Sequence, residues 1–213
     1  MSQLTLYDYY RSSSAYRVRI ALNIKAVEFQ KVDINLLEEA HFDKNYLSLN
    51  PQRLVPTLDT GADIISQSLA IIEWLDETYP HPALLPTDPV TRARVKSLSY
   101  AIAMDIQPLN NLRVQKYLRQ AEHWNDEQIN NWYQHWIATG FSSLETQLAT
   151  AGCNGKFCFG DSATMADICL VPQVYNAERF HCDLSHYPLI RSVVAHCNSL
   201  QAFIRATPEA VKP

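Results

Sequence analysis

The sequence lacks the features that direct a chain to nucleic acid, to a membrane or to the secretory pathway. Its 213 residues carry a formal net charge of −4 and a pI near 5.9, which argues against an electrostatic nucleic-acid binder because such proteins present a basic face. No apolar run has the length needed to span a bilayer. The N-terminal Met1-Ser2-Gln3-Leu4 has neither the basic nor the apolar region of a signal peptide. We therefore expect a soluble, cytoplasmic protein with no nucleic-acid and no membrane partner.

Cysteine is missing from the chain before Cys153, and the five cysteines that follow show no tight pairing. An odd number of scattered cysteines indicates reduced thiols rather than a disulfide framework. His181-Cys182 and His196-Cys197 lack the close ligand spacing of a zinc site. The sequence therefore predicts free thiols and no bound metal ion.

Strand and helix patterns alternate in the first part of the chain, and helical patterns alone follow. Strands are expected over residues 4–7, 27–34, 55–58 and 64–66, and helices up to residue 24, over 38–48 and after an N-cap at Ser68. A proline-rich linker at 82–86 precedes a long helix with apolar residues at 95, 98, 102 and 106. This order predicts an α/β domain over residues 1–82 and an all-helical domain over 88–213.

One helix of the second part has a recognisable start. Thr164-Met165-Ala166-Asp167 has the form of a capping box, and it precedes the apolar run Ile168-Cys169-Leu170-Val171. We therefore expect Thr164 and Asp167 to serve folding rather than chemistry.

The most informative segment is Arg11-Ser12-Ser13-Ser14, which joins the first predicted strand to the first predicted helix. The serine hydroxyls at this junction lie beside the free N–H groups of the helix's first turn, where the helix dipole favours an anion. A thiolate would be stabilised at this position, as a cysteine's is at a helix N-terminus. Because no cysteine precedes Cys153, such a thiolate has to arrive on a bound molecule, for which glutathione is the obvious candidate. A purely structural capping role for the serines stays open as the alternative.

Two further segments fit a peptide-like ligand. A cis proline at Pro56 would leave the N–H and C=O of Val55 open to an extended ligand, as one more strand of the sheet. Ser68, at a helix N-terminus, would receive a carboxylate.

These segments resemble the thioredoxin-like domain of glutathione transferases, and the zeta class in particular. Ser12-Ser13-Ser14-Ala15-Tyr16-Arg17-Val18-Arg19-Ile20-Ala21-Leu22 is similar to the zeta signature Ser-Ser-Cys-x-Trp-Arg-Val-Arg-Ile-Ala-Leu. The resemblance extends over nearly the whole chain, through residues 49–51, 55–58, 67–73, 106–109 and 170–180. Ser14 replaces the family's cysteine and Tyr16 its tryptophan, which excludes a redox role for this turn while leaving the sulfur of glutathione in place.

The resemblance implies a fold, an activity and a set of partners. The fold is a thioredoxin-like α/β domain plus an all-α domain that completes the substrate pocket. Zeta enzymes are maleylacetoacetate isomerases, and close relatives isomerise maleylpyruvate, so the resemblance implies glutathione-dependent cis–trans isomerisation of a small dicarboxylate enone by a homodimer. Which keto acid is used stays open. So do two alternatives, conjugation or dehalogenation of α-halo acids and a non-catalytic binding module.

The resemblance also implies roles for individual residues. Ser12 would hydrogen-bond the glutathione sulfur, and Ser13 and Ser14 would complete the polar site. Glutathione itself would be bound by His41, Val55, Gln67, Ser68, Gln107 and Asn111. For His41, an exposed helix histidine without a function is an equal alternative.

Three arginines are the predicted substrate-binding residues. The resemblance places Arg11, Arg113 and Arg179 around the pocket for the second substrate. A guanidinium binds a carboxylate through a planar two-point fork, and a maleyl keto acid carries two carboxylates. Arg113 is closer to the bacterial maleylpyruvate isomerases than to the animal enzymes. Arg17 and Arg19, by contrast, are expected to form structural salt links on the first helix.

Overall fold

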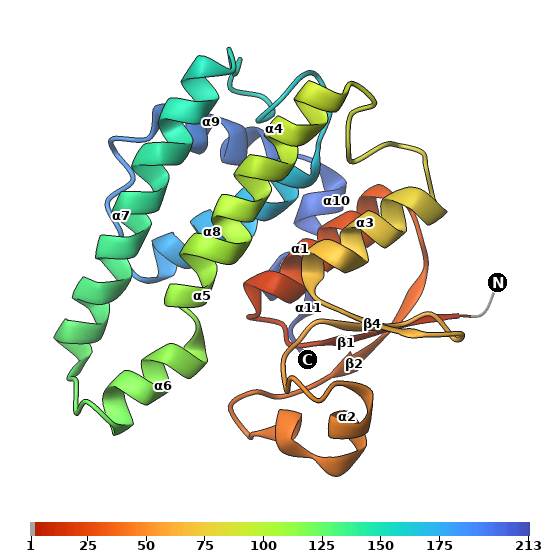
Figure 1. Ribbon diagram of the computed structural model, residues 1–213, viewed down its shortest axis with the longest axis vertical. Coiled ribbons are helices and arrows are strands. Elements are labelled where there is room, and N and C mark those ends of the chain that lie inside the picture. The colour runs from red at the N-terminus through yellow and green to blue at the C-terminus, as the bar shows by residue number, and fades with distance from the viewer. Residues whose placement is uncertain (1–2) are drawn as a thin grey trace. The chain divides into compact units, whose positions relative to one another are not determined.

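The computed structural model describes residues 3–213 and divides into two compact units (Figure 1). Unit 1 combines the N-terminal segment up to Leu84 with Leu200–Pro213, and unit 2 is Leu85–Ser199. Met1 and Ser2, part of the segment considered for a signal peptide, lie outside the described residues. The assignment of glutathione binding to residues 1–82 and of the substrate pocket to 88–213 concerns function and stays a prediction.

Unit 1 is built on a four-stranded mixed sheet with the order β2-β1-β3-β4. Its strands are β1 (Leu4–Asp8), β2 (Phe29–Asp33), β3 (Thr57–Asp59) and β4 (Ile64–Ser66). β1 runs parallel to β2 and antiparallel to β3, with Leu6 opposite Lys31 on one side and Leu58 on the other. The predicted alternation of strands and helices is confirmed in this unit, since parallel strands need a helical crossover.

Helices α1 (Ser13–Ile24) and α3 (Ser68–Thr78) pack against each other beside this sheet (Figure 1). The apolar positions of α1 are fully buried with those of α3, among them Val18, Ile20, Ile71 and Ile72. The peptide bond before Pro56 is cis, as predicted, and β3 follows directly.

The predicted helix over 38–48 is shorter and interrupted in the structure. A 3₁₀ turn, η1 (Ala40–Phe42), is followed by α2 (Lys44–Leu49), which ends at Asn50 before Pro51. The interruption lies at Asp43, which has extended backbone dihedrals and accepts a hydrogen bond from the N–H of Asn45 through its side chain. An aspartate that caps the next turn competes with a continuous helix, and this competition explains the difference.

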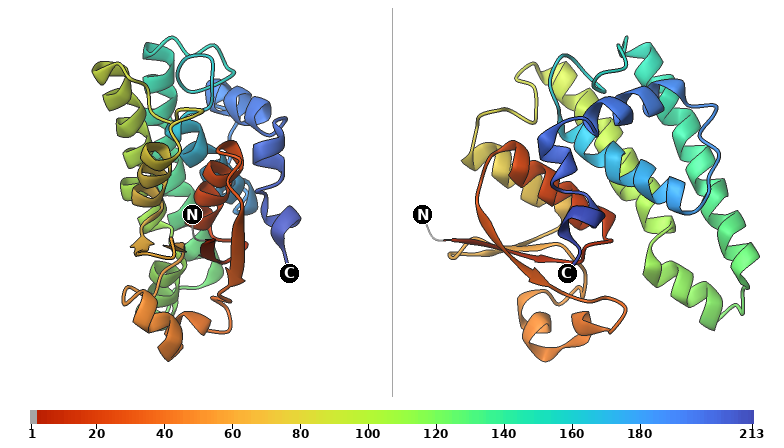
Figure 2. Two further views of the ribbon diagram at one scale, coloured as in Figure 1. Left: turned by 90° about the vertical axis from the view of Figure 1, so that its right-hand side faces the viewer. Right: turned by 180° about the vertical axis from the view of Figure 1, so that it is seen from behind.

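The C-terminal segment belongs to unit 1 (Figure 2). It carries two short helices, α10 (Gln201–Ile204) and α11 (Pro208–Val211). The side chain of Asn23 on α1 donates to the carbonyl of Ala202 at 2.9 Å, so that α10 lies against α1. No periodic pattern in the sequence indicated this return of the chain.

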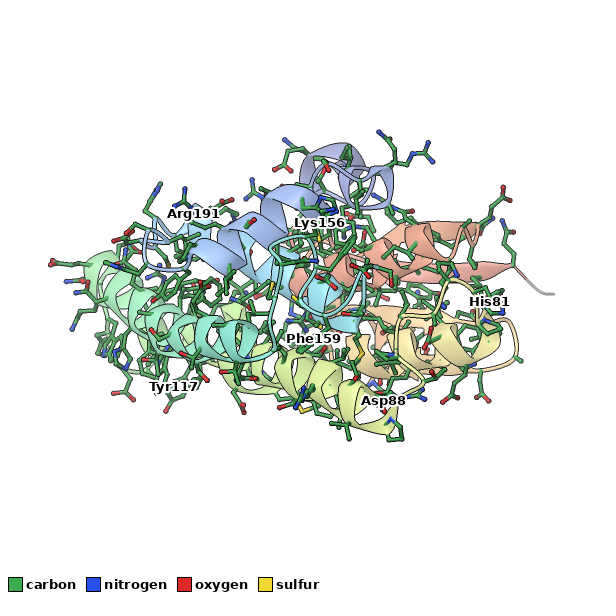
Figure 3. All side chains as sticks on the ribbon, turned by 90° about the horizontal axis from the view of Figure 1, so that it is seen from above. His81, Asp88, Tyr117, Lys156, Phe159 and Arg191 are labelled. Atoms are coloured by element: carbon green, nitrogen blue, oxygen red, sulfur yellow. The ribbon has the colours of Figure 1, made fainter. Side chains whose placement is uncertain are left out.

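Unit 2 is helical throughout its described elements, as predicted. It contains α4 (Pro89–Tyr100), η2 (Ala101–Ile106), α5 (Gln107–Leu109), α6 (Leu112–Gln120), α7 (Asp126–Thr150), α8 (Met165–Arg179) and α9 (Pro188–Cys197). Helix α8 is buried on all sides over its first ten residues and packs on α4 and α9. Asp88, labelled in Figure 3, caps the start of α4.

The predicted long helix after the linker differs in one respect. Residues Ala101–Ile106 form a π-helical segment, in which the N–H of Gln107 bonds to the carbonyl of Ile102 five residues back. Pro108 follows and has no N–H to donate, so the ordinary pattern cannot continue through it. Gly140 on α7 leaves room for Ile106, because a Cβ at that position would collide with its side chain. π-Helical turns inside helices are frequent at functional sites, and this one comes directly before Gln107.

Within residues 3–213, no helix combines the length and the apolar character that crossing a membrane requires.

Candidate active site

The N-terminus of α1 presents the predicted serine cluster. Ser12 is the N-cap residue and accepts a hydrogen bond from the N–H of Ala15 at 3.3 Å. Ser13 is buried and Ser14 half-buried, and the first turn contains no acidic side chain. The positive end of the helix dipole is therefore not compensated by a carboxylate of its own first turn, and it favours an external anion.

The turn that leads into α1 is held by a buried ion pair. Arg19 donates to the carboxylate of Asp8 at 2.7 Å, and both side chains are almost fully buried. The same guanidinium donates to the carbonyls of Tyr10 at 3.0 Å and Ala206 at 2.9 Å. Burial raises the pKa of Asp8, and the neighbouring Arg19 opposes that rise. Arg19 thus forms the structural link predicted for it and fixes the backbone just before Ser12.

Val55 stands next to the cis Pro56 with its backbone available. Its side chain packs in a small buried cluster with Tyr9, Ile34 and Tyr46. Among the described residues, no hydrogen bond involves the N–H or the C=O of Val55. A backbone of this kind can pair with an extended ligand, and the pairing of Val55 with glutathione stays a prediction.

The N-terminus of α3 carries Gln67 and Ser68, with one difference from the prediction. Ser68 is the first helical residue and not the cap; Gln67 occupies the cap position with a positive φ of 73°. Gln67 makes no side-chain hydrogen bond to the first turn of α3. The sequence therefore carries no capping signal that would locate the start of this helix to within one residue. The Gln67 amide donates to the side chain of Gln52 at 2.9 Å, and Ser68 accepts from Arg17 at 3.3 Å.

His41 lies in η1, half-buried, with its ring 4.3 Å from that of Phe42. Its role toward glutathione stays a prediction.

Three predicted residues of unit 2 lie close together in the chain where η2 gives way to α6. Gln107 opens α5, and Asn111 caps α6 by accepting from the N–H of Arg113 at 3.0 Å. Gln107 and Asn111 are half-buried, whereas Arg113 is exposed. Asn111 thus has a structural role beside its predicted binding role.

Arg179 is the last residue of α8 and is also exposed. Its guanidinium lies 5.9 Å from the centroid of the Phe180 ring and donates to the side chain of Asn176 at 3.3 Å. Phe180 in turn stacks on Tyr133 of α7 with ring centroids 3.7 Å apart. In unit 1, Arg11 lies over the Tyr10 ring at 5.2 Å. Both arginines rest on aromatic rings, which leaves their polar edges for a carboxylate.

Four of the chain's five thiols are poorly suited to act as nucleophiles. Burial raises the pKa of Cys153, Cys158 and Cys197, and that of Cys182 to about 11. Only a thiolate attacks, so a nucleophilic sulfur at this site has to come with a ligand. In the described part of the chain, no three His, Cys, Asp or Glu side chains gather as a metal site.

Sequence reasoning missed two residues at the N-terminus of α3. The salt link expected for Arg17 stays a prediction, and its hydrogen bond to Ser68 also joins α1 to the predicted carboxylate site. Gln52 positions the Gln67 amide from a loop distant in sequence. No local sequence pattern pointed to either contact, because Arg17 lies 51 positions from Ser68 and Gln52 lies 15 positions from Gln67.

Comparison with known proteins decides the family. The family described as "Glutathione S-transferase, N-terminal domain" matches residues 6–83. A maleylpyruvate isomerase from Ralstonia is 48% identical over 97% of this chain and 98% of its own, and a probable maleylacetoacetate isomerase from Vibrio cholerae is 47% identical over 98% and 97%. A solved maleylpyruvate isomerase, described as a bacterial zeta-class glutathione transferase, is 48% identical and superimposes with a TM-score of 0.96 over 98% of both chains. The chain belongs to the zeta class of glutathione transferases.

The zeta-class assignment confirms the predicted fold, an α/β glutathione transferase N-terminal domain followed by a helical region. A maleylacetoacetate isomerase from Methylobacterium extorquens, solved with malonate and glutathione bound, is 34% identical and has a TM-score of 0.93 over 98% of both chains. Glutathione, and an anion with two carboxylates, are therefore ligands of a structure similar to this chain.

Proposed function

We propose that this zeta-class protein is a glutathione-dependent isomerase that converts the cis double bond of a maleyl keto acid to trans. The observation that carries the proposal is the N-terminus of α1, where a hydroxyl N-cap stands at a helix end whose first turn has no acidic side chain. The names of its zeta-class relatives support the same activity. Their substrates are maleylpyruvate and maleylacetoacetate, and both fit the proposal.

The residues present fit glutathione. A hydroxyl and a helix N-terminus at Ser12 suit a thiolate, and the open backbone of Val55 suits the cysteinyl peptide. Gln67 and Ser68 suit the γ-glutamyl carboxylate at the start of α3. Bound there, glutathione supplies a sulfur that adds reversibly to the conjugated double bond, so that the bond between the former alkene carbons becomes single and can rotate.

The side chains of the protein are proposed to make this chemistry accessible at neutral pH. Ser12 donates its hydroxyl proton to the thiolate and so lowers the thiol pKa, with Ser13 and Ser14 completing the polar surroundings. Each unit by which the pKa falls multiplies the reactive fraction roughly tenfold while the thiol is mostly protonated. Arg11, Arg113 and Arg179 are proposed to bind the substrate carboxylates and to stabilise negative charge that develops on the keto oxygen. His41, Gln107 and Asn111 are proposed to contact glutathione.

Substitution of Ser12 tests the proposal. In Ser12→Ala we expect the pKa of bound glutathione's thiol, followed by thiolate absorbance, to rise and kcat/KM for isomerisation to fall by about 100-fold, the usual cost of one lost donor to a developing anion. Ser12→Thr should restore both. Thr207→Ala is the matched control, because Thr207 also caps a helix of unit 1 and its loss costs about 1 kcal/mol of stability without touching the site. If Ser12→Ala leaves both the thiol acidity and the turnover unchanged, the proposal is wrong.

The reaction itself is followed by the enone absorbance of maleylpyruvate or maleylacetoacetate mixed with glutathione and enzyme. Isomerisation is the expected result, and the relative rates identify the preferred keto acid. Turnover of chloroacids alone would replace the proposal by a conjugating or dehalogenating transferase. Glutathione binding without turnover of either class would replace it by a binding module.

The substrate arginines have their own test. Arg113→Met and Arg179→Met should each raise KM for the keto acid about tenfold or more, since each removes a charge-assisted bond to a carboxylate. Arg191→Met, an exposed arginine on α9 labelled in Figure 3, should leave KM unchanged. Equal effects in all three variants would show a general loss of charge rather than substrate binding.

We also propose that the enzyme is a cytoplasmic homodimer. The absence of a helix suited to a membrane within residues 3–213 agrees with such a location. Light scattering after size-exclusion chromatography should give twice the mass of the 24.3 kDa chain.

A further inference from the structure

Two arginines of α1 are equally buried and make different contacts. Arg17 and Arg19 are each 1% exposed. Arg19 is engaged by the carboxylate of Asp8 and by two backbone carbonyls, so its role in folding is clear. The Nη1 of Arg17 donates to the hydroxyl of Ser68, the first residue of α3, at 3.3 Å.

The chemistry of this contact fixes the direction of the Ser68 hydroxyl. A guanidinium has N–H donors and no acceptor, so Ser68 Oγ is the acceptor in the bond from Arg17. The hydroxyl proton of Ser68 is then left to donate elsewhere, and a carboxylate is a pure acceptor when ionised. The first turn of α3 contains no acidic residue that could take this proton internally.

The positive charge of Arg17 also favours a carboxylate at the N-terminus of α3. Arg17 keeps its positive charge at every pH of interest, and charges interact more strongly in a buried site than in water. Its charge adds to the positive end of the α3 dipole at the residue proposed to receive the γ-glutamyl carboxylate.

We infer that Arg17 is a positioning residue for glutathione: it orients and polarises the Ser68 hydroxyl, so that the N-terminus of α3 selects a ligand with a carboxylate on its γ-glutamyl group. The inference rests on the proposed function in taking glutathione as the ligand and Ser68 as the residue that receives its γ-glutamyl carboxylate. It makes Arg17 a determinant of cofactor specificity rather than a contact with the substrate.

A pair of ligands isolates this effect. Calorimetry gives the Kd of glutathione and of γ-aminobutyryl-cysteinyl-glycine, which lacks the carboxylate in question and keeps the amino group. We expect the wild-type protein to prefer glutathione by about tenfold or more, in line with a charge-assisted bond. In Arg17→Met this preference should be largely lost, because glutathione binds more weakly while the analogue binds as before.

Two further readouts separate positioning from a general effect on folding. In Arg17→Met, KM for glutathione should rise while kcat at saturating glutathione and the pKa of the bound thiol stay unchanged, because Ser12 sets the acidity of the sulfur. Arg17→Lys, which retains the charge, should recover part of the preference. Arg19→Met is the matched buried-arginine control: it should lower the melting temperature and keep the wild-type preference.

The outcomes are decisive for the inference. A preference that survives in Arg17→Met, with both ligands weakened alike, overturns it. Where Arg17→Met does not fold, Arg17→Leu, which also removes both the N–H donors and the charge, takes its place, and a wild-type preference in that variant overturns the inference equally. If the wild-type protein binds glutathione but turns over no keto acid, the proposed isomerisation fails while the binding comparison still judges Arg17.

Discussion

The N-termini of α1 and α8 have the same backbone N–H groups but differ in the side chains that satisfy them. At α8, Thr164 and Asp167 form the predicted capping box, and the Asp167 carboxylate accepts from the N–H of Thr164 at 2.8 Å and from that of Cys158 at 2.7 Å. At α1, the cap is Ser12 alone, and no acidic residue follows in the first turn. The N-terminus of α8 is saturated from within the chain, whereas the N-terminus of α1 retains its attraction for an anion.

This difference shows how one fold separates stability from function. Asp167 is completely buried inside unit 2, and burial raises its pKa although its hydrogen-bond donors oppose the rise. Ser12 is half-buried and belongs to a turn held in place by the ion pair of Arg19 with Asp8. The same motif of a polar N-cap therefore serves a core in one place and a proposed ligand site in the other.

Removing the internal carboxylate should have the largest effect. Asp167→Ala leaves the N–H groups of Thr164 and Cys158 and the Thr164 hydroxyl without their acceptor, and we expect the free energy of unfolding to fall by about 3 kcal/mol or more. Urea unfolding measures this loss. Glutathione affinity, measured well below the melting temperature, should not change.

Asp126→Ala is the control for that substitution. Asp126 is also an acidic residue in the first turn of a helix, α7, but its side chain is 89% exposed. Its loss should cost less than about 1 kcal/mol, because an exposed charge is screened by water. Equal losses in the two variants would mean that burial does not distinguish the two helix ends.

A carboxylate placed in the first turn of α1 should reduce the attraction of this helix end for an external anion. Ser14→Asp places a negative charge in the first turn, which should stabilise the fold by about 0.5 kcal/mol and at the same time raise the pKa of bound glutathione's thiol. Thermal unfolding and thiolate absorbance measure the two effects. Ser14→Asn, close in size and neutral, should change neither; a thiol pKa that stays constant in Ser14→Asp would contradict an anion site at this helix end.

The smallest expected effect is at a third helix end, that of α4. The exposed carboxylate of Asp88 accepts from the N–H and the hydroxyl of Thr91, and these bonds lower the pKa of Asp88 below 3.8. A lowered folded-state pKa means that the cap stabilises α4 above the ordinary pKa and loses this effect as the pH falls through the folded value. The protection factor of the Thr91 amide, which is its intrinsic exchange rate divided by the measured rate, should therefore fall at acid pH in the wild type.

Asp88→Asn serves as the reference for that measurement. An asparagine cap does not titrate, so exchange at Thr91 in this variant should lack the additional acid-dependent step. The same acid dependence in both proteins would assign it to another group.

The predictions from sequence succeeded where the signal is local. The strand and helix on either side of the serine turn, the cis proline at Pro56 and the capping box at Thr164 follow from turn chemistry, apolar spacing and capping, and the structure has all of them. The prediction of one helix over residues 38–48 was wrong because Asp43 starts a new turn. The continuous helix predicted after the linker was wrong at Ala101–Ile106, where a π segment precedes Pro108.

The sequence by itself determined the family, through motifs spread over nearly the whole chain. It also determined the alternation of strands and helices in unit 1 and the residue types at each helix end, because these depend on neighbours within a few positions. Only the tertiary structure decided which polar groups meet. Arg17 and Ser68 are separated by 51 positions, and Arg19 and Ala206 by 187, and no periodicity connects either pair. Hydrogen bonds over such separations depend on how packed elements place their side chains, and packing brings together what the chain's order keeps apart.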